Sequence, residues 1–188
     1  VSDAVCIQVQ PLQVTLHNPP SIHFPSCTDS RKRVIQLGEA PETVFNVGGL
    51  GNENIKSVSL MSLSEFEDSV SWKGIVPFAL VTYHPVTARG GDVKREMSRF
   101  LNALEKCGLN LLFTKSNADA GADVINRMID GFCAAHPDTS RAFHSLGLVR
   151  YLSRMNYASV VAGNSSSGVV ETPAFGVPCV NVGDRQKG

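Results

Sequence analysis

From residue 78 to the end, short apolar runs alternate with segments whose apolar residues recur at helical spacing. Five runs have the length and composition of buried strands, at 78–83, 109–113, 141–146, 159–162 and 178–182. Four segments have the helical period, at 92–107, 122–135, 148–155 and 167–175. Strands that alternate with helices of about 10–15 residues form βαβ units, in which consecutive strands run parallel. The sequence therefore predicts an α/β fold built on a doubly wound, Rossmann-like parallel sheet.

The first 77 residues are patterned less clearly. Residues 1–26 are rich in proline, and we expect an irregular lead-in that holds at most a short strand near 8–16. Beyond it we expect a helix over 29–37, a strand at 44–47 and a helix over 64–68 with Ser64 as its N-cap. We accordingly expect residues 1–26 to be a lead-in or the remnant of another domain, and residues 27–188 to form one Rossmann-like domain.

The charge balance argues against several classes of partner. Seventeen Lys and Arg residues balance seventeen Asp and Glu residues, so nothing in the net charge favours nucleic acid or an anionic membrane. No apolar run approaches the roughly 20 residues that span a bilayer, and the sequence shows no charged-then-apolar leader. We therefore expect a protein that is not exported and that works in the cytoplasm.

The cysteines support the same compartment. All five are widely spaced and form no pattern typical of a zinc site, so we expect reduced thiols and no metal. Cys179 falls in the last predicted strand, and we expect it to be buried there.

Ligands of doubly wound sheets bind at the carboxyl ends of the strands, where the chain leaves a strand for a helix. That rule selects four loops, at 84–91, 114–121, 145–148 and 163–168. We therefore expect the binding and catalytic residues to lie in these loops and at the end of the last strand.

The loop Gly163-Asn-Ser-Ser-Ser-Gly168 leaves a predicted strand and opens a predicted helix. Its glycines allow a close approach of the backbone, its serines offer hydroxyl groups, and a helix amino end adds unpaired N–H groups. Together these features favour a phosphate or diphosphate. The alternative is plain capping, because one serine at that position already caps a helix. The Gly-Lys-Ser/Thr ending of a P-loop is missing.

Four further residues are candidates. Glu171 lies one turn into the same predicted helix and could accept bonds from ribose hydroxyls, or simply be an acid near a helix amino end. His84 follows a strand, and Pro85 keeps the chain from entering a helix at once, so its imidazole should project from the carboxyl edge. Arg185, in a glycine-framed turn, could bind a phosphate or be solvated. Asn117 could bond a base or a sugar, or its loop could merely cap the next helix through Asp119.

Five groups of residues, in this order along the chain, resemble the UDP-N-acetylglucosamine 2-epimerases. They are Arg31-Lys-Arg-Val-Ile-Gln-Leu-Gly-Glu39 with Val44-Phe-Asn-Val-Gly-Gly49, Val81-Thr-Tyr-His-Pro-Val-Thr87, Asn117-Ala-Asp-Ala-Gly121, Gly163-Asn-Ser-Ser-Ser-Gly168 with Glu171, and Gly183-Asp-Arg-Gln-Lys-Gly188. The resemblance extends from about residue 22 to the end. The loops that begin at His84 and Gly183 are similar to those of the hydrolysing branch, which acts in sialic-acid pathways.

The resemblance implies two facing Rossmann-like domains in the glycosyltransferase-B arrangement, with this chain as the carboxyl-terminal domain that holds UDP. By position in the family, Ser165, Ser166 and Arg185 would contact the diphosphate, and Glu171 would contact the ribose. No cofactor is implied.

The same resemblance places the remaining candidates around the nucleotide sugar. The backbone near Leu146 and the side chain of Asn117 would lie near the uracil. His84 would lie at the diphosphate and the sugar, where it would help the leaving group depart.

The reaction that the resemblance implies starts from UDP-N-acetylglucosamine. Elimination of UDP gives a 2-acetamidoglucal, and water then adds with inverted configuration at C2, so that N-acetylmannosamine and UDP are released. The amino-terminal domain of that family, with the carboxylates that move the C2 proton, has no counterpart in the sequence. We therefore expect the chain alone to be inactive, and the whole protein to be a dimer or tetramer.

Two other functions fit the same residues. A glycosyltransferase of the same architecture would share the UDP site but would transfer the sugar to an acceptor. A non-catalytic nucleotide-binding module or fragment would bind UDP without turnover.

Overall fold

The computed structural model describes residues 22–49, 55, 57–86, 92–116 and 121–186. The chain divides into two compact units, with the division between Ser57 and Val58. The predicted domain boundary at residue 27 is not tested by this division and stays a prediction.

The described part of the first unit is a small helix between two extended segments. Helix α1 spans Thr28–Gln36, and the 3-10 helix η1 spans Pro41–Thr43. A single parallel bridge joins His23 to Val44, so the strand that we predicted at 44–47 is reduced to this bridge. The helix predicted over 29–37 is confirmed.

The second unit is built on one five-stranded sheet in which every pairing is parallel. The strands are β1 (Phe78–Thr82), β2 (Asn110–Thr114), β3 (Ser140–Phe143), β4 (Val160–Gly163) and β5 (Cys179–Asn181). Their order is β3-β2-β1-β4-β5. The chain therefore moves outward from β1 in one direction and then returns to continue in the other, which confirms the doubly wound α/β fold.

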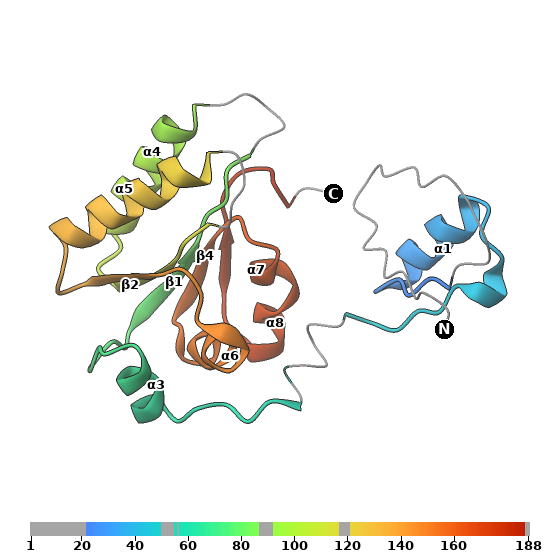
Figure 1. Ribbon diagram of the computed structural model, residues 1–188, viewed down its shortest axis with the longest axis horizontal. Coiled ribbons are helices and arrows are strands. Elements are labelled where there is room, and N and C mark those ends of the chain that lie inside the picture. The colour runs from blue at the N-terminus through green and yellow to red at the C-terminus, as the bar shows by residue number, and fades with distance from the viewer. Residues whose placement is uncertain (1–21, 50–54, 56, 87–91, 117–120, 187–188) are drawn as a thin grey trace. The chain divides into compact units, whose positions relative to one another are not determined.

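Helices cover both faces of this sheet (Figure 1). Helices α4 (Val93–Glu105) and α5 (Ala122–Ala135) lie on one face. Helices α3 (Leu63–Ser69) and α6 (Gly147–Tyr157), with the short helices α7 (Ser167–Val170) and α8 (Thr172–Phe175), lie on the other. Each strand and helix predicted from residue 78 onward, apart from the segment 167–175, is present within a few residues of its predicted bounds.

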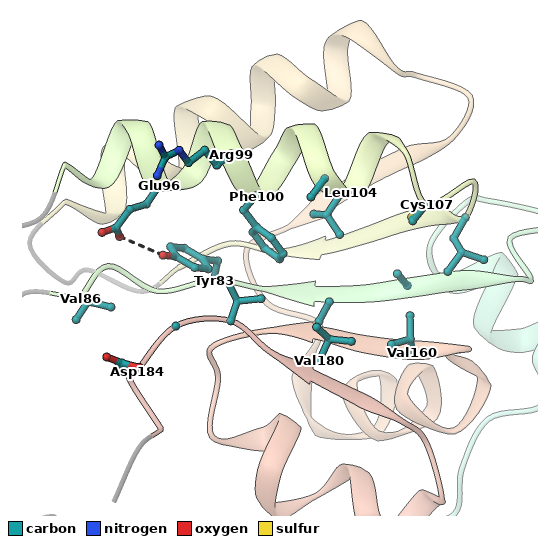
Figure 2. A pocket seen from close by; sticks show the side chains of 16 residues that line it. Tyr83, Val86, Glu96, Arg99, Phe100, Leu104, Cys107, Val160, Val180 and Asp184 are labelled. Atoms are coloured by element: carbon teal, nitrogen blue, oxygen red, sulfur yellow. Dashed lines mark hydrogen bonds between the residues drawn. The ribbon is translucent and has the colours of Figure 1, made fainter.

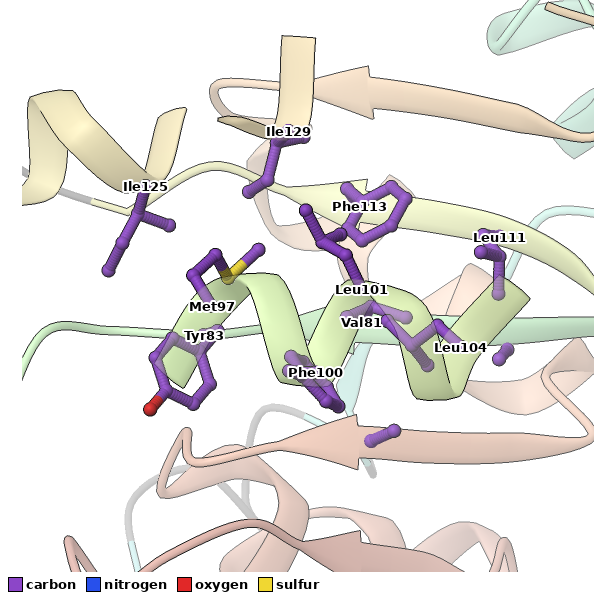
Figure 3. Close-up of a cluster of buried hydrophobic side chains, with 12 residues drawn as sticks. Val81, Tyr83, Met97, Phe100, Leu101, Leu104, Leu111, Phe113, Ile125 and Ile129 are labelled. Carbon is purple, nitrogen blue, oxygen red and sulfur yellow. The ribbon is translucent and has the colours of Figure 1, made fainter. Parts of the chain in front are cut away.

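The two faces of β1 explain why its sequence is apolar throughout. Ala79 and Val81 pack into the cluster under α4 and α5, where Met97 and Phe113 are fully buried (Figure 3). Phe78 and Leu80 point to the opposite face and pack against α3 and α6. A central parallel strand is buried on both sides, so its residues alternate between two cores rather than between core and solvent.

The helix predicted over 167–175 is broken into α7 and α8, with Glu171 between them. Pro173 explains the break, because it lacks an N–H group and its ring clashes with the carbonyl four residues earlier in a continuous helix. The Thr172 hydroxyl instead donates to the Gly168 carbonyl.

Two other predictions are wrong. Ser62, not Ser64, is the N-cap of α3, where it forms a capping box with Glu65. Cys179 is exposed rather than buried, and Val180 beside it is 55% exposed. Their strand β5 is the edge of the sheet, and Val180 faces an open hollow beside α4. Among the described cysteines Cys27, Cys107, Cys133 and Cys179, none is in a disulfide.

Candidate functional site

The reversal of strand order places a crevice between the carboxyl ends of β1 and β4. These strands are neighbours, with Thr82 paired to Gly163 at their last register position. The chain leaves β1 toward α4 on one face of the sheet and leaves β4 toward α7 on the other. Ligands of doubly wound sheets bind where the strand order reverses in this way. His84 follows β1 at this crevice, and the serine loop follows β4.

Gly163 permits the close approach of the two strands. Its φ is +138°, and a Cβ atom built on it would lie 1.8 Å from the carbonyl oxygen of Thr82. Any other residue would overlap that backbone atom. The first glycine of the serine loop is therefore required by the sheet itself, whatever the loop binds.

Asn164 joins the two strand ends. Its side chain is fully buried, Oδ1 accepts from the His84 backbone N–H at 2.7 Å, and Nδ2 donates to the His84 carbonyl at 2.8 Å. Its own carbonyl accepts from Arg185 Nη1 at 3.1 Å and Gln186 Nε2 at 2.9 Å. Asn164 thus ties together the loops after β1, β4 and β5. Asn164 was not among the predicted site residues, although its position between Gly163 and three serines was a signal for it.

His84 lies in the crevice, as its position after β1 predicted. Its Nδ1 lies 3.0 Å from the hydroxyl of Ser116, a buried residue after β2. Ser116 is itself fixed through its backbone, because Asn126 of α5 accepts from its N–H at 2.9 Å and donates to its carbonyl at 3.1 Å. The imidazole is therefore oriented by a chain of contacts that reaches the next helix.

The three serines of the loop differ in exposure. Ser165 and Ser167 are partly buried, and their hydroxyls lie 3.1 Å apart. Ser166 is exposed, occupies the N-cap position of α7 and makes no side-chain capping bond. Ser165 instead accepts from the Ser167 backbone N–H at 3.4 Å, at the start of α7. Because α7 has only four residues, its dipole contributes little, and hydroxyl and backbone donors are the groups available to an anion.

A cavity of about 430 Å³ opens at this crevice. Its lining residues are Thr82, His84, Thr114, Lys115, His144, Ser145, Leu146, Gly147, Leu148, Tyr151, Arg154 and Ser165. Among the described residues that line it, Lys115 and Arg154 are cationic and none carries a carboxylate. Lys115 contacts Asp130 at 2.6 Å, which partly offsets its charge. The cavity is thus suited to an anionic ligand with polar groups.

A second hollow, of about 720 Å³, lies on the face of the sheet between α4 and strands β4 and β5 (Figure 2). Phe100 and Leu104 of α4 and Val160 and Val180 of the strands face it. The Tyr83 hydroxyl donates to Glu96 at 3.3 Å at one end. An apolar hollow beside a carboxylate is a poor site for a diphosphate, so the crevice between β1 and β4 is the better candidate despite its smaller volume.

The other predicted residues are distributed around the crevice. Leu146 is buried at the start of α6, and its carbonyl accepts from Arg150 Nε at 2.9 Å. Arg185 is exposed and reaches the site through the Asn164 carbonyl. Glu171 does not line the cavity, and its Oε2 is buried without a hydrogen-bond partner in the described part of the chain. Asn117 and Asp119 lie outside the described residues.

Within residues 22–49, 55, 57–86, 92–116 and 121–186, no cluster of three or more His, Cys, Asp or Glu side chains could hold a metal ion. No helix in the same ranges has the length and apolar character that a membrane span requires.

Comparison with known proteins identifies the family. A family model described as UDP-N-acetylglucosamine 2-epimerase matches residues 17–188. The chain belongs to this family. The predicted resemblance is therefore confirmed over nearly the whole sequence.

Two curated relatives are clearly similar to the chain. It is 38% identical over 168 residues to the GDP/UDP-N,N'-diacetylbacillosamine 2-epimerase (hydrolyzing) of Campylobacter jejuni, with 89% of this chain and 44% of that protein covered. It is 37% identical over 170 residues to the polysialic acid biosynthesis protein P7 of Escherichia coli, with 89% of this chain and 42% of that protein covered. The chain thus spans less than half the length of these relatives.

Two solved structures share the fold. The UDP-N-acetylglucosamine 2-epimerase of Neisseria meningitidis, bound to UDP-N-acetylglucosamine, superposes with a TM-score of 0.64 at 14% identity, over 87% of this chain and 44% of that one. The S. aureus MnaA–UDP co-structure superposes with a TM-score of 0.61 at 17% identity, over 84% of this chain and 42% of that one. Identities this low support the fold and not the details of the site.

Proposed function

We propose that the chain is the UDP-binding half of a hydrolysing UDP-N-acetylglucosamine 2-epimerase. One observation carries the proposal. In a chain of this family, the Asn164 side chain hydrogen-bonds the serine loop to the His84 backbone, where the strand order reverses between β1 and β4. The relative from C. jejuni is named a hydrolyzing 2-epimerase, which supports the hydrolysing branch. The activity of the whole protein is part of the proposal, because the chain covers 44% of that relative.

The proposed chemistry assigns the donors of the crevice to the diphosphate. Ser165 lines the cavity, Ser166 is exposed beside it, and Arg185 has donors beyond the one that contacts Asn164. These three groups would stabilise the negative charge that collects on the diphosphate as the bond to the sugar breaks. His84, oriented by Ser116, would assist the departure of UDP.

The remaining residues are assigned to the ribose and the uracil of the nucleotide. Glu171 would accept bonds from the ribose, while the backbone at Leu146 and the side chain of Asn117 would lie near the uracil. Water would then add to the glycal with inversion at C2, so that UDP-N-acetylglucosamine and water become N-acetylmannosamine and UDP. The step needs no cofactor. The carboxylates that move the C2 proton would lie in the other half of the protein, so we expect the chain alone to bind UDP without turnover.

The same proposal includes expectations for the compartment, the oligomeric state and the pathway. The whole protein would act in the cytoplasm as a dimer or tetramer. The similarity to a polysialic acid biosynthesis protein of E. coli supports a role in making a sialic acid or a related sugar.

The test uses the full-length protein with UDP-N-acetylglucosamine as the sole substrate. We expect N-acetylmannosamine and UDP to appear without any acceptor, as followed by proton NMR. His84→Ala and Ser166→Ala should each lower kcat by about 100-fold or more, because each removes a group from the departing diphosphate. His136→Ala, which changes a histidine paired with Glu105 at the far end of α5, is the control and should leave kcat unchanged.

The outcomes separate the alternatives. Sugar transfer that requires an added acceptor would establish the glycosyltransferase instead. UDP binding without product from either assay would indicate a non-catalytic module. Unchanged turnover in both site variants would contradict the assignment of the crevice.

A further inference from the structure

The contact between Ser116 and the His84 imidazole is anchored at both ends. Ser116 follows β2, is 6% exposed, and places its hydroxyl oxygen 3.0 Å from His84 Nδ1. Asn126 of α5 bonds both the N–H and the carbonyl of Ser116, and Asn164 bonds the same two backbone groups of His84. Two buried or partly buried backbones are thus held so that this hydroxyl meets this ring nitrogen.

The direction of the hydrogen bond decides where the neutral imidazole carries its proton. In the described part of the chain, His84 Nδ1 is the only partner at hydrogen-bond distance from the Ser116 hydroxyl. If Nδ1–H donated, the hydroxyl proton would be buried without an acceptor, which is unfavourable. If the hydroxyl donates, Nδ1 is the acceptor and every proton of the pair is used. A neutral imidazole has one N–H group, so its proton then lies on Nε2.

A serine also suits the charged form of the imidazole. When both ring nitrogens are protonated, the hydroxyl can rotate and accept from Nδ1–H, because a hydroxyl is both a donor and an acceptor. Nε2 keeps its proton in either case. The Ser116 contact therefore leaves His84 with a donor at Nε2 whether the imidazole is neutral or charged.

A permanent donor matches the chemistry proposed for the crevice, where His84 and Ser165 line the same cavity. As the bond from the sugar C1 to the diphosphate oxygen breaks, its electron pair stays on that oxygen, and UDP leaves as an anion. A donated hydrogen bond stabilises this charge, whereas the lone pair of an unprotonated nitrogen would repel it. No proton needs to be transferred to the diphosphate.

Building on the proposed function, we propose that Ser116 is a positioning residue that keeps the neutral His84 imidazole in its Nε2–H form. His84 then donates this hydrogen to the departing diphosphate, and Asn126 supports the arrangement by fixing the Ser116 backbone.

The tautomer can be measured in the chain without nucleotide. Long-range proton–nitrogen correlation spectra of the isotope-labelled chain report which ring nitrogen is protonated, and His84→Ala assigns the signals. At a pH where the imidazole is neutral, we expect a protonated Nε2 and an unprotonated Nδ1. Ser116→Ala should move the two nitrogen shifts toward each other, as two tautomers exchange, and Ser116→Thr should restore them. A proton on Nδ1 in the wild type, or an unchanged pattern in Ser116→Ala, would overturn the inference.

Turnover of the full-length protein tests the role of the tautomer. Ser116→Ala should lower kcat by about tenfold with little change in KM, because the lost interaction acts on the departing group. The ratio of wild-type to variant kcat should grow as the pH rises and the imidazole loses its second proton, since a charged imidazole presents Nε2–H without help. The other titratable residues of the described cavity lining occur in both proteins, so their titrations cancel in the ratio; they are Lys115, His144, Tyr151 and Arg154.

Matched variants separate this role from a structural one. Ser116→Thr, which keeps the hydroxyl, should recover most of the kcat. Ser64→Ala, at an exposed serine of α3, should leave kcat unchanged at every pH. A ratio that is constant with pH, or no recovery by Ser116→Thr, would overturn the inference in favour of a structural role. An inactive wild-type protein would contradict the proposed function, while the tautomer measured in the chain would still test the role of Ser116.

Discussion

Gly163 and Asn164 are adjacent residues that hold the candidate site in two different ways. The glycine lets β4 run close to β1, because a Cβ atom would collide with the Thr82 carbonyl. The asparagine then bonds both backbone groups of His84. The geometry of the crevice therefore depends on one absent side chain and one buried amide.

Gly163→Ala should destabilise the second unit by about 3 kcal/mol or more, because the new methyl group overlaps a backbone oxygen in a conformation that alanine rarely adopts. Urea unfolding followed by circular dichroism measures the change. Gly131→Ala is the matched control, since that glycine lies in the middle of α5 with no atom within 4 Å of the added carbon. It should stabilise the chain by about 0.5–1 kcal/mol. Equal effects of the two substitutions would contradict the close approach of β1 and β4.

Residue-level prediction from sequence succeeded where a rule tied a residue to a strand end. His84 and the serine loop were placed in this way, and both lie at the crevice. Asn164 and Ser116 were missed because their roles depend on neighbours that are distant in sequence. Ser116, for example, contacts His84, which is 32 positions away.

At the scale of single elements, helix α3 shows how local bonds decide where a helix begins. Ser62 accepts from the Glu65 backbone N–H at 3.3 Å, and the Glu65 carboxylate accepts from the Ser62 N–H at 2.8 Å. These bonds from Ser62 hold the pKa of the Glu65 carboxyl below its ordinary value. The predicted cap, Ser64, is exposed and lies inside the helix.

Ser62→Ala should lower Tm at neutral pH, while Ser64→Ala should leave it unchanged. The folded-state pKa of Glu65 is depressed, so its contribution is present above the ordinary value of 4.5 and is lost as the pH falls through the lower folded value. The difference in Tm between the wild type and Ser62→Ala should therefore narrow on acidification below about pH 4.5. Differential scanning calorimetry between pH 3 and 7 measures this; a gap that is constant or widens would contradict the capping box.

The bounds of strands and helices from residue 78 onward were predictable from the apolar pattern. Continuous apolar runs form the buried strands, and apolar residues at helical spacing form the helix faces that pack on the sheet. The break at Glu171 was also signalled, since Pro173 lies inside the predicted helix. The exposure of β5 was not predictable, because an apolar edge strand and an apolar central strand have the same local pattern. Only the strand order distinguishes them.

At the scale of the whole molecule, the strand order β3-β2-β1-β4-β5 explains why one crevice collects the candidate residues. Alternating strands and helices predicted the doubly wound class, and the family model confirmed the resemblance read from five groups of residues. The central claim is therefore that this half binds UDP at the carboxyl ends of β1 and β4.

A titration of the isotope-labelled chain with UDP, followed by amide NMR, tests this claim most directly. We predict that the amides of His84, Ser116 and Ser165, at the carboxyl ends of β1, β2 and β4, shift progressively as UDP is added. The amide resonances of Ala103 and Cys107, which line the apolar hollow beside α4, should not shift. Shifts confined to that hollow, or none at all at millimolar UDP, would contradict the account.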